Sequence, residues 1–208
     1  SPHDPATVWV AFRRDRVGDP APYVFRSADY GRTWTRTTDG FDADQPVRVV
    51  REDPERRGLL YAGTENGAWV SLDGAPWTRL AGMPVTPVTD LEARHGDLIA
   101  STEGRAFWIL DDLAPFRQQT SAVASAAVHL YAPRPALLVD ASSFFGGGGD
   151  RVGRNPSFGA TVFYRLAAAP DSTTTVTLEF LDARGLVVRR YASAPGTTGT
   201  AGGPPTPR

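Results

Sequence analysis

The chain of 208 residues contains neither cysteine nor lysine. Without cysteine there can be no disulfide scaffold, thiol nucleophile or cysteine-ligated zinc. The 22 basic residues are therefore all arginine, and they balance 23 acidic residues to leave a formal net charge of −1. Because this balance creates no overall field that attracts a polyanion, we expect no nucleic-acid partner.

Long apolar runs are missing as well. No run approaches the roughly 20 residues that span a bilayer, so we expect no transmembrane segment. The start of the chain, residues 1–5, lacks the charged and apolar regions of a signal peptide. Two explanations stay open at this point: a cytosolic chain, or an export signal that lies upstream of this sequence.

The apolar residues that are present occur in short runs, which 21 glycines and 18 prolines separate. No segment keeps a 3.6-residue period over ten or more positions, and each run has the length of a strand. The pattern predicts an all-β fold with strands at 8–12, 23–27, 47–51, 59–63, 68–72, 88–93, 98–101 and 106–110. Residues 121–128, rich in small side chains, are the single candidate helix and could equally form an extended linker.

An internal repeat relates residues 23–36 to residues 68–79, with the serines at 27 and 71 in matching positions. The repeat distance is close to the period of about 40 residues that is typical of propeller blades. Residues 105–112 form a third, decayed copy that keeps the strand and the acidic turn but lacks the closing tryptophan.

The first copy contains the pattern Ser-x-Asp-x-Gly-x-Thr-Trp at Ser27, Asp29, Gly31, Thr33 and Trp34. Asp29 and, more weakly, Ser27 can accept hydrogen bonds from turn amides, and Gly31 supplies the positive φ of a tight turn. We predict a structural role in which Trp34 is mostly buried between strands. The corresponding residues of the second copy are Ser71, Asp73 and Trp77, without the Gly-x-Thr spacing.

The ordered series of motifs resembles one protein family. The series consists of residues 4–12, the complete Asp-box at 27–34, residues 49–54, 60–65, 84–90 and 104–112. It is similar to sialidase-like Asp-box (BNR) β-propellers, specifically the large exported bacterial proteins described as sortilin-type or glycosyl-hydrolase-like. The resemblance implies propeller blades over residues 1–117, Asp-boxes on the outer rim, and an extracytoplasmic (periplasmic or secreted) location with the signal peptide outside this chain. Glu103 stands where the family is expected to carry histidine.

The C-terminal part has a different pattern. After an expected linker at 118–130, strands are expected at 131–139, 160–166, 173–181 and 186–192, the last two forming a hairpin around residues 182–185. These strands resemble the immunoglobulin-like module of the same family. Four strands are too few for a complete sandwich, so residues 131–193 are expected to form an incomplete β-sandwich. The Gly/Thr/Pro tail at 194–208 is expected to be disordered.

Three groups of residues are candidate ligand sites. The Gly-rich loop 144–150 lacks the Lys-Ser/Thr of a phosphate cradle and has the character of a flexible loop. The histidines are widely spaced, and the acidic loop 38–44 lacks the bidentate glutamate of a calcium site. The side chains concerned are His3, His95, His129, Asp39, Asp42 and Asp44. We therefore expect neither a metal nor a cofactor.

Retaining sialidases use arginines, a tyrosine with a glutamate partner and an aspartic acid, taken from different blades. Tyr61, Glu65, Arg105 and Asp111 are residues of these types. The alternative is that Tyr61 packs within its strand while Arg105 and Asp111 form a salt bridge. Residue types without geometry assign no catalytic residue here.

The expected function follows from the number of blades. Residues 1–117 hold two to three blades of about 40 residues, whereas a closed propeller needs at least about four. We therefore expect part of a larger protein that acts as a noncatalytic binding or structural module through its blades and open sheet edges, such as 106–110 and 186–192. The alternative is a piece of a glycoside hydrolase whose active site lies mainly in other blades. The expected partners are other protein subunits, which can dock the chain on a membrane complex, or the rest of the same polypeptide, with about 1,000 Å² or more buried; carbohydrate is an alternative ligand.

Overall fold

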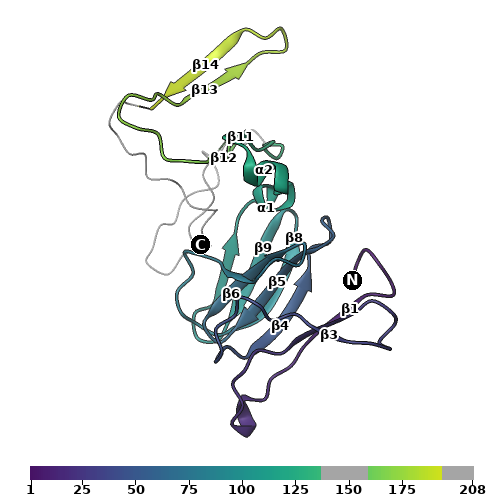
Figure 1. The fold of residues 1–208 in the computed structure, drawn as a ribbon. Coiled ribbons are helices and arrows are strands. Elements are labelled where there is room, and N and C mark those ends of the chain that lie inside the picture. The colour runs from purple at the N-terminus through teal and green to yellow at the C-terminus, as the bar shows by residue number, and fades with distance from the viewer. Residues whose placement is uncertain (137–158, 194–208) are drawn as a thin grey trace, which may run out of the picture.

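The computed structural model describes residues 1–136 and 159–193. The Gly-rich loop 144–150, the tail 194–208 and the end of the expected strand 131–139 lie outside these residues. The described part of the chain is all-β, as the sequence predicts, and forms five separate antiparallel sheets (Figure 1).

The first sheet has three strands in the order β1-β2-β3, with bounds Val8–Ala11, Val24–Ser27 and Thr35–Arg36. A short 3₁₀ helix, η1 (Asp15–Val17), lies between β1 and β2. The predicted strands at 8–12 and 23–27 are confirmed. Strand β3 was not predicted, because two residues are too few to show an alternating pattern.

The second and third sheets account for the other strands predicted in the first half of the chain. The second sheet contains β4 (Val47–Glu52), β5 (Leu59–Thr64), β6 (Gly67–Leu72) and β7 (Thr78–Arg79) in chain order. The third contains β8 (Val88–Arg94), β9 (Asp97–Thr102) and β10 (Phe107–Leu110). Both sheets are simple meanders in which consecutive strands pair.

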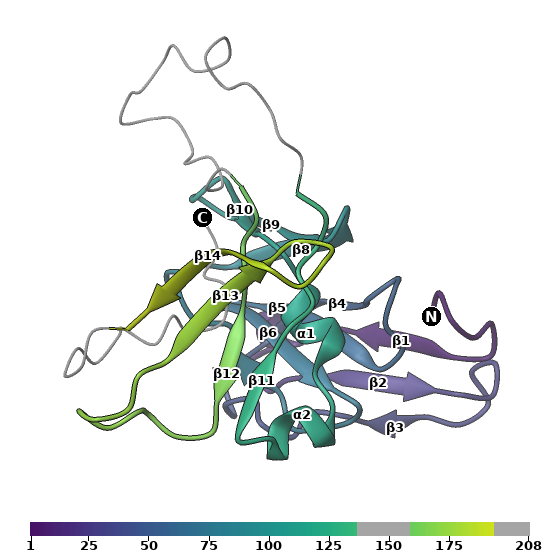
Figure 2. The same ribbon diagram turned by 90° about the horizontal axis from the view of Figure 1, so that it is seen from above.

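The three sheets stack face to face in chain order (Figure 2). The interface between the first and second sheets includes Trp9, Val24, Leu60, Ala62 and Trp69. The interface between the second and third includes Tyr61, Val70, Val88, Leu91 and Leu98. Meander sheets stacked in this way are propeller blades. The described chain therefore contains three blades, which do not close a ring.

Strand β5 shows why the middle blade is the core of the molecule. All six of its residues are buried, because alternate side chains point into the two blade interfaces. Gly63 leaves no room for a side chain: a Cβ atom there would lie 2.7 Å from side-chain carbons of Val49 in the same sheet and of Val88 in the third sheet. Any larger residue at this position would force the second and third blades apart.

Two short helices follow the third blade. Helix α1 (Ala114–Gln118) was not predicted, and α2 (Ser121–Ser125) ends three residues before the predicted end at 128. Thr120 caps α2, since its hydroxyl accepts a hydrogen bond from the Val123 amide at 3.2 Å. Strand β11 (Val128–Leu130) then pairs with β12 (Tyr164–Leu166). The expected linker 118–130 thus contains a helix and a strand.

The last described element is the predicted hairpin, formed by β13 (Thr177–Leu181) and β14 (Val187–Ala192). It projects away from the blades in Figure 1. None of the residues 159–193 is buried. Within the described chain, the expected sandwich therefore consists of two strand pairs, β11-β12 and β13-β14, without a packed core between them.

Candidate functional site

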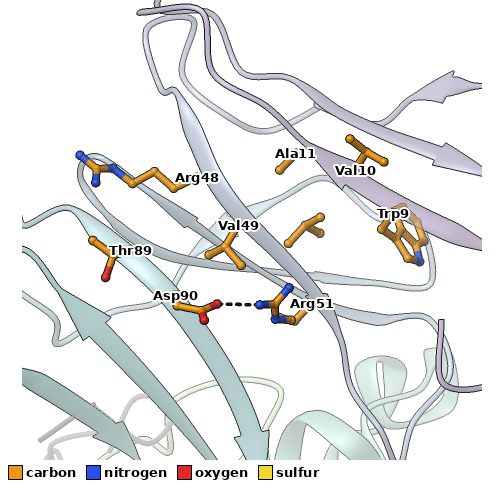
Figure 3. A pocket seen from close by; sticks show the side chains of 9 residues that line it. Trp9, Val10, Ala11, Arg48, Val49, Arg51, Thr89 and Asp90 are labelled. Atoms are coloured by element: carbon orange, nitrogen blue, oxygen red, sulfur yellow. Dashed lines mark hydrogen bonds and ion pairs between the residues drawn. The ribbon is translucent and has the colours of Figure 1, made fainter.

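One strand from each blade lines a groove of about 450 Å³. Its lining consists of Trp9, Val10 and Ala11 from β1, residues 48–51 from β4, and Thr89 and Asp90 from β8. Figure 3 shows Arg48 and Trp9 at opposite ends of the groove, with Val49 and the Arg51–Asp90 pair between them. The groove thus combines an apolar centre with charged groups toward the third blade.

Arg51 connects the second blade to the third across this groove. Its Nη2 lies 2.8 Å from Asp90 Oδ1, and its Nε donates to the Leu91 carbonyl oxygen at 3.2 Å. The Arg51 and Asp90 side chains are 49% and 60% exposed. Exposed pairs of this kind contribute about 0–1 kcal/mol because water and salt screen them. This pair orients the two strands but adds little stability.

A chain of alternating charges connects all three blades at one end of the groove. Arg48 donates two hydrogen bonds to Glu65, from Nε at 2.7 Å and Nη2 at 3.0 Å, and its Nη2 also lies 3.0 Å from Glu103. Glu65 in turn pairs with Arg13, which follows β1, at 3.0 Å. The hydrogen bonds with Glu65 raise the pKa of Arg48 above its ordinary value. The guanidinium therefore stays charged and cross-links the blades.

Glu103, which stands at the position where the family resemblance implies histidine, belongs to this chain of charges. A carboxylate at 103 gives Arg48 a second anionic partner, which a neutral imidazole would not provide. Glu103 therefore takes part in the ion pairs that join the blades, and it cannot take a role that depends on an imidazole.

At the opposite end of the second blade, Asp53 is the centre of a second network. Its side chain is fully buried. Its Oδ1 accepts the backbone amides of Glu55 and Arg56 at 2.8 and 2.9 Å, and its Oδ2 accepts the Tyr61 hydroxyl at 3.0 Å. Arg117 on α1 donates to the same carboxylate from Nε and Nη2, each at 3.1 Å from Oδ2. The network fixes α1 to the turn between β4 and β5.

Tyr61 has a packing role in this structure. Its side chain is fully buried in the interface between the second and third blades. Burial, reinforced by the Asp53 carboxylate, raises the pKa of Tyr61 far above its ordinary value. The phenol is therefore a neutral hydrogen-bond donor, which is the opposite of what a tyrosine nucleophile requires.

The structure does not assemble a sialidase-type site from the four residues that the sequence suggested. Tyr61 bonds to Asp53 in the turn before β5, whereas Glu65 bonds to arginines just after β5, at the opposite end of the strand. Arg105 is exposed in the turn that precedes β10, and Asp111 follows β10. The alternative role offered for Tyr61, packing within its strand, is confirmed.

The first Asp-box forms a closed turn around Asp29. Its carboxylate accepts the Thr33 amide at 2.9 Å, the Thr33 hydroxyl at 2.6 Å and the Ser27 hydroxyl at 2.8 Å. The Ser27 oxygen accepts the Gly31 amide at 2.8 Å, and Gly31 has a φ of 84°. The hydrogen bonds from Thr33 are the main reason why the pKa of Asp29 falls to about 2. The charged Asp29 carboxylate therefore accepts these hydrogen bonds from residues of its own turn.

The second Asp-box has lost this closure. Ser71 donates to the Ala75 carbonyl oxygen at 2.6 Å, and Asp73 pairs with Arg56 at 2.8 Å. No threonine stands where Thr33 stands in the first box, so the Asp73 carboxylate turns to the neighbouring loop.

The expectation that Trp34 is mostly buried is wrong: this residue is 46% exposed, and its Nε1 donates to the Gly31 carbonyl oxygen within the same turn, at 3.0 Å. Its counterpart Trp77 is 4% exposed. Trp77 donates from Nε1 to the Thr37 carbonyl oxygen at 2.8 Å, and the Phe41 ring stacks on it at 4.9 Å. Thr37 and Phe41 lie in the loop that arrives from the first blade. The loop that arrives from the first blade therefore contributes to the burial of Trp77.

That same loop carries the three aspartates considered for calcium. The side chains of Asp39, Asp42 and Asp44 are exposed, and the Asp39 carbonyl oxygen accepts the Trp77 amide at 2.7 Å. Residues 1–136 and 159–193 contain no group of three or more His, Asp or Glu side chains that could hold a metal ion. The same residues contain no helix that is both long and apolar enough to cross a membrane.

The chain was compared with known proteins. No protein-family model and no curated protein matches it. Among solved structures, it is similar to a GH74 xyloglucanase from Xanthomonas campestris, with a TM-score of 0.40 and 18% sequence identity. The match covers 52% of this chain and 20% of the xyloglucanase chain. This chain therefore spans about a fifth of that protein, and a similarity of this size assigns neither a family nor an activity to it.

Proposed function

We propose that this chain is a noncatalytic structural and binding module of a larger extracytoplasmic protein or complex, and that a further propeller blade covers the outer face of its first sheet. The observation that carries the proposal is the contrast between the two box tryptophans. Trp77 is covered by the blade before it, whereas Trp34 is half-exposed.

The contrast extends to other residues on the same face of the first sheet. Strand registers place Ala11 opposite Val24 and Gly63 opposite Ala68, so β1 and β2 correspond to β5 and β6. On the second sheet the face that contains Trp69 is covered by the first blade. The corresponding face of the first sheet carries Val8 and Phe12, which are 39% and 42% exposed. The face that forms a blade interface in the second sheet is thus exposed in the first sheet.

The chemistry of this outer face suits a protein partner. Phe12 stacks on Tyr23 and Phe25 with ring centroids 5.0 and 5.5 Å apart. Arg36 lies over the Tyr23 ring at 4.8 Å from the ring centroid. Aromatic residues and arginine are the side chains that most often anchor protein interfaces.

The glycoside-hydrolase alternative receives no comparable support. Tyr61 is buried and neutral, and Glu65 is held by two arginines. In the described residues, the charged groups nearest the groove are likewise engaged in ion pairs that join blades. These contacts explain the same residues by a structural role.

Replacing Phe25 by serine tests the proposal. The wild-type chain should self-associate through its open aromatic face, so light scattering after size-exclusion chromatography should give a mass above 22.3 kDa that rises with concentration. Phe25→Ser should return the mass toward 22.3 kDa, because the substitution removes one of the three stacked rings of this face.

The matched control is Phe107→Ser, which removes an equally large ring that is 72% exposed on β10, away from this face. It should leave self-association unchanged. A wild-type chain that stays a monomer at every concentration, or a control as effective as Phe25→Ser, would contradict the proposal.

A further inference from the structure

Within residues 1–136 and 159–193, the first sheet lacks a counterpart of one strand that the second sheet has. Strand β5 lies between β4 and β6, whereas β1, which corresponds to β5, pairs only with β2 in the described chain. The missing neighbour is the counterpart of β4. The groove described above is lined by β1, β4 and β8, and a strand that pairs with the open edge of β1 would lie there (Figure 3).

The hydrogen bonds show which groups of β1 are available to that strand. The Phe12 amide donates to the Tyr23 carbonyl oxygen at 3.2 Å, so these two residues form a hydrogen-bonded pair. In an antiparallel ladder such pairs alternate with pairs that do not bond to each other. Val10 therefore bonds to β2, while the N–H and C=O groups of Trp9 and Ala11 point to the open edge.

The second sheet has the same alternation of hydrogen-bonded and non-hydrogen-bonded pairs. The Asp53 amide donates to the Leu59 carbonyl oxygen at 2.8 Å, so the alternation directs the groups of Tyr61 and Gly63 toward β4. Tyr61 and Gly63 are the counterparts of Trp9 and Ala11. The same backbone groups that hold β4 in the second sheet are thus open in the first.

We infer that an extended strand, from the polypeptide that carries the further blade, pairs antiparallel with β1 and fills this groove. The inference rests on the function proposed above. The side chains expected in this strand follow from β4, where Val49 and Val50 lie opposite Gly63 and Ala62. Both valines are buried, at 6% and 8% exposure. The added strand therefore carries two consecutive aliphatic residues opposite Ala11 and Val10.

Trp9 gives this strand a second point of contact. Its indole Nε1 is buried and has no hydrogen-bond partner within the described chain. A buried donor without a partner destabilises the structure that contains it. A carbonyl or hydroxyl oxygen of the added strand beside Trp9 satisfies this donor, which an apolar surface pressed against the groove would not do.

A peptide with the sequence of residues 46–53, which contains β4, is the probe for this strand. Titrated into the isotope-labelled 208-residue chain, it should shift the NMR amide signals of Trp9 and Ala11 in a saturable way and slow their hydrogen exchange. The amide of Val10, already bonded to β2, should change much less. Signal shifts confined to the outer face of the first sheet, around Phe12 and Tyr23, or no shifts at all, would overturn the inference.

Two N-methylated peptides provide the matched control. Methylation at the positions of Val49 and Arg51 blocks the amides that would bond to Ala11 and Trp9, so binding should be lost. Methylation at the position of Val50, whose amide points to the other side, should leave binding intact. Equal binding by both would overturn the inference. If the peptide fails while Phe25→Ser still abolishes self-association, the strand is excluded but the covered outer face stands.

Discussion

Replacing Asp53 by asparagine should lower the free energy of unfolding by about 3–5 kcal/mol, because it removes one partner of a buried ion pair. The asparagine has the same size, but it is uncharged and has a single oxygen, which can replace either Oδ1 or Oδ2, beside an Arg117 side chain that is only 14% exposed. The NH2 group of the asparagine would face either the backbone amides of Glu55 and Arg56 or the donors of Arg117 and Tyr61, and all of these are donors that an NH2 group cannot satisfy. Urea denaturation followed by circular dichroism measures the change.

Asp90→Asn is the control for this prediction. It makes the same chemical change in an ion pair with Arg51, but at a carboxylate that is 60% exposed. Its effect should stay within about 1 kcal/mol, since exposed pairs are screened. If the two substitutions cost the same, the Asp53 network does not hold α1 and the blades together as described.

The second large effect is expected at Trp77. Trp77→Ala should destabilise the chain by about 3–5 kcal/mol, the usual cost of deleting a buried aromatic side chain. The substitution removes the contact with Phe41 and the hydrogen bond to the Thr37 carbonyl oxygen, which together join the first blade to the second.

Trp34→Ala is the natural comparison, because Trp34 occupies the same position of the repeat. It is 46% exposed and bonds only within its own turn, so its loss should cost less than about 1 kcal/mol in the isolated chain. Thermal or urea unfolding of the two variants side by side measures the difference. Equal costs would show that the two tryptophans have equivalent surroundings.

Local sequence signals predicted much of the blade architecture. Apolar runs between glycines and prolines located eight of the ten strands in residues 1–110, since alternation and turn residues act over a few positions. The same signals were too weak for β3 and β7, which have two residues each, and for α1, which has five residues and a proline near its start.

The features that depend on distant residues were not predictable in this way. Arg117 meets Asp53 across 64 positions, and Arg48 meets Glu65 across 17, so no spacing rule connects them. The exposure of Trp34 likewise depends on residues that are distant in the sequence. Its box pattern is complete, but burial depends on a loop like that of Phe41, which a local motif does not encode.

Oxidative footprinting of the two box tryptophans tests the central claim most directly. Hydroxyl radicals followed by mass spectrometry report the exposure of Trp34 and Trp77 in the isolated chain and in the protein as purified from the cells that make it. We predict that Trp77 is protected in both samples, and that Trp34 reacts in the isolated chain but is protected in the purified protein by the further blade. Equal reactivity of Trp34 in both samples would contradict the account, because the outer face of the first sheet would then have no partner.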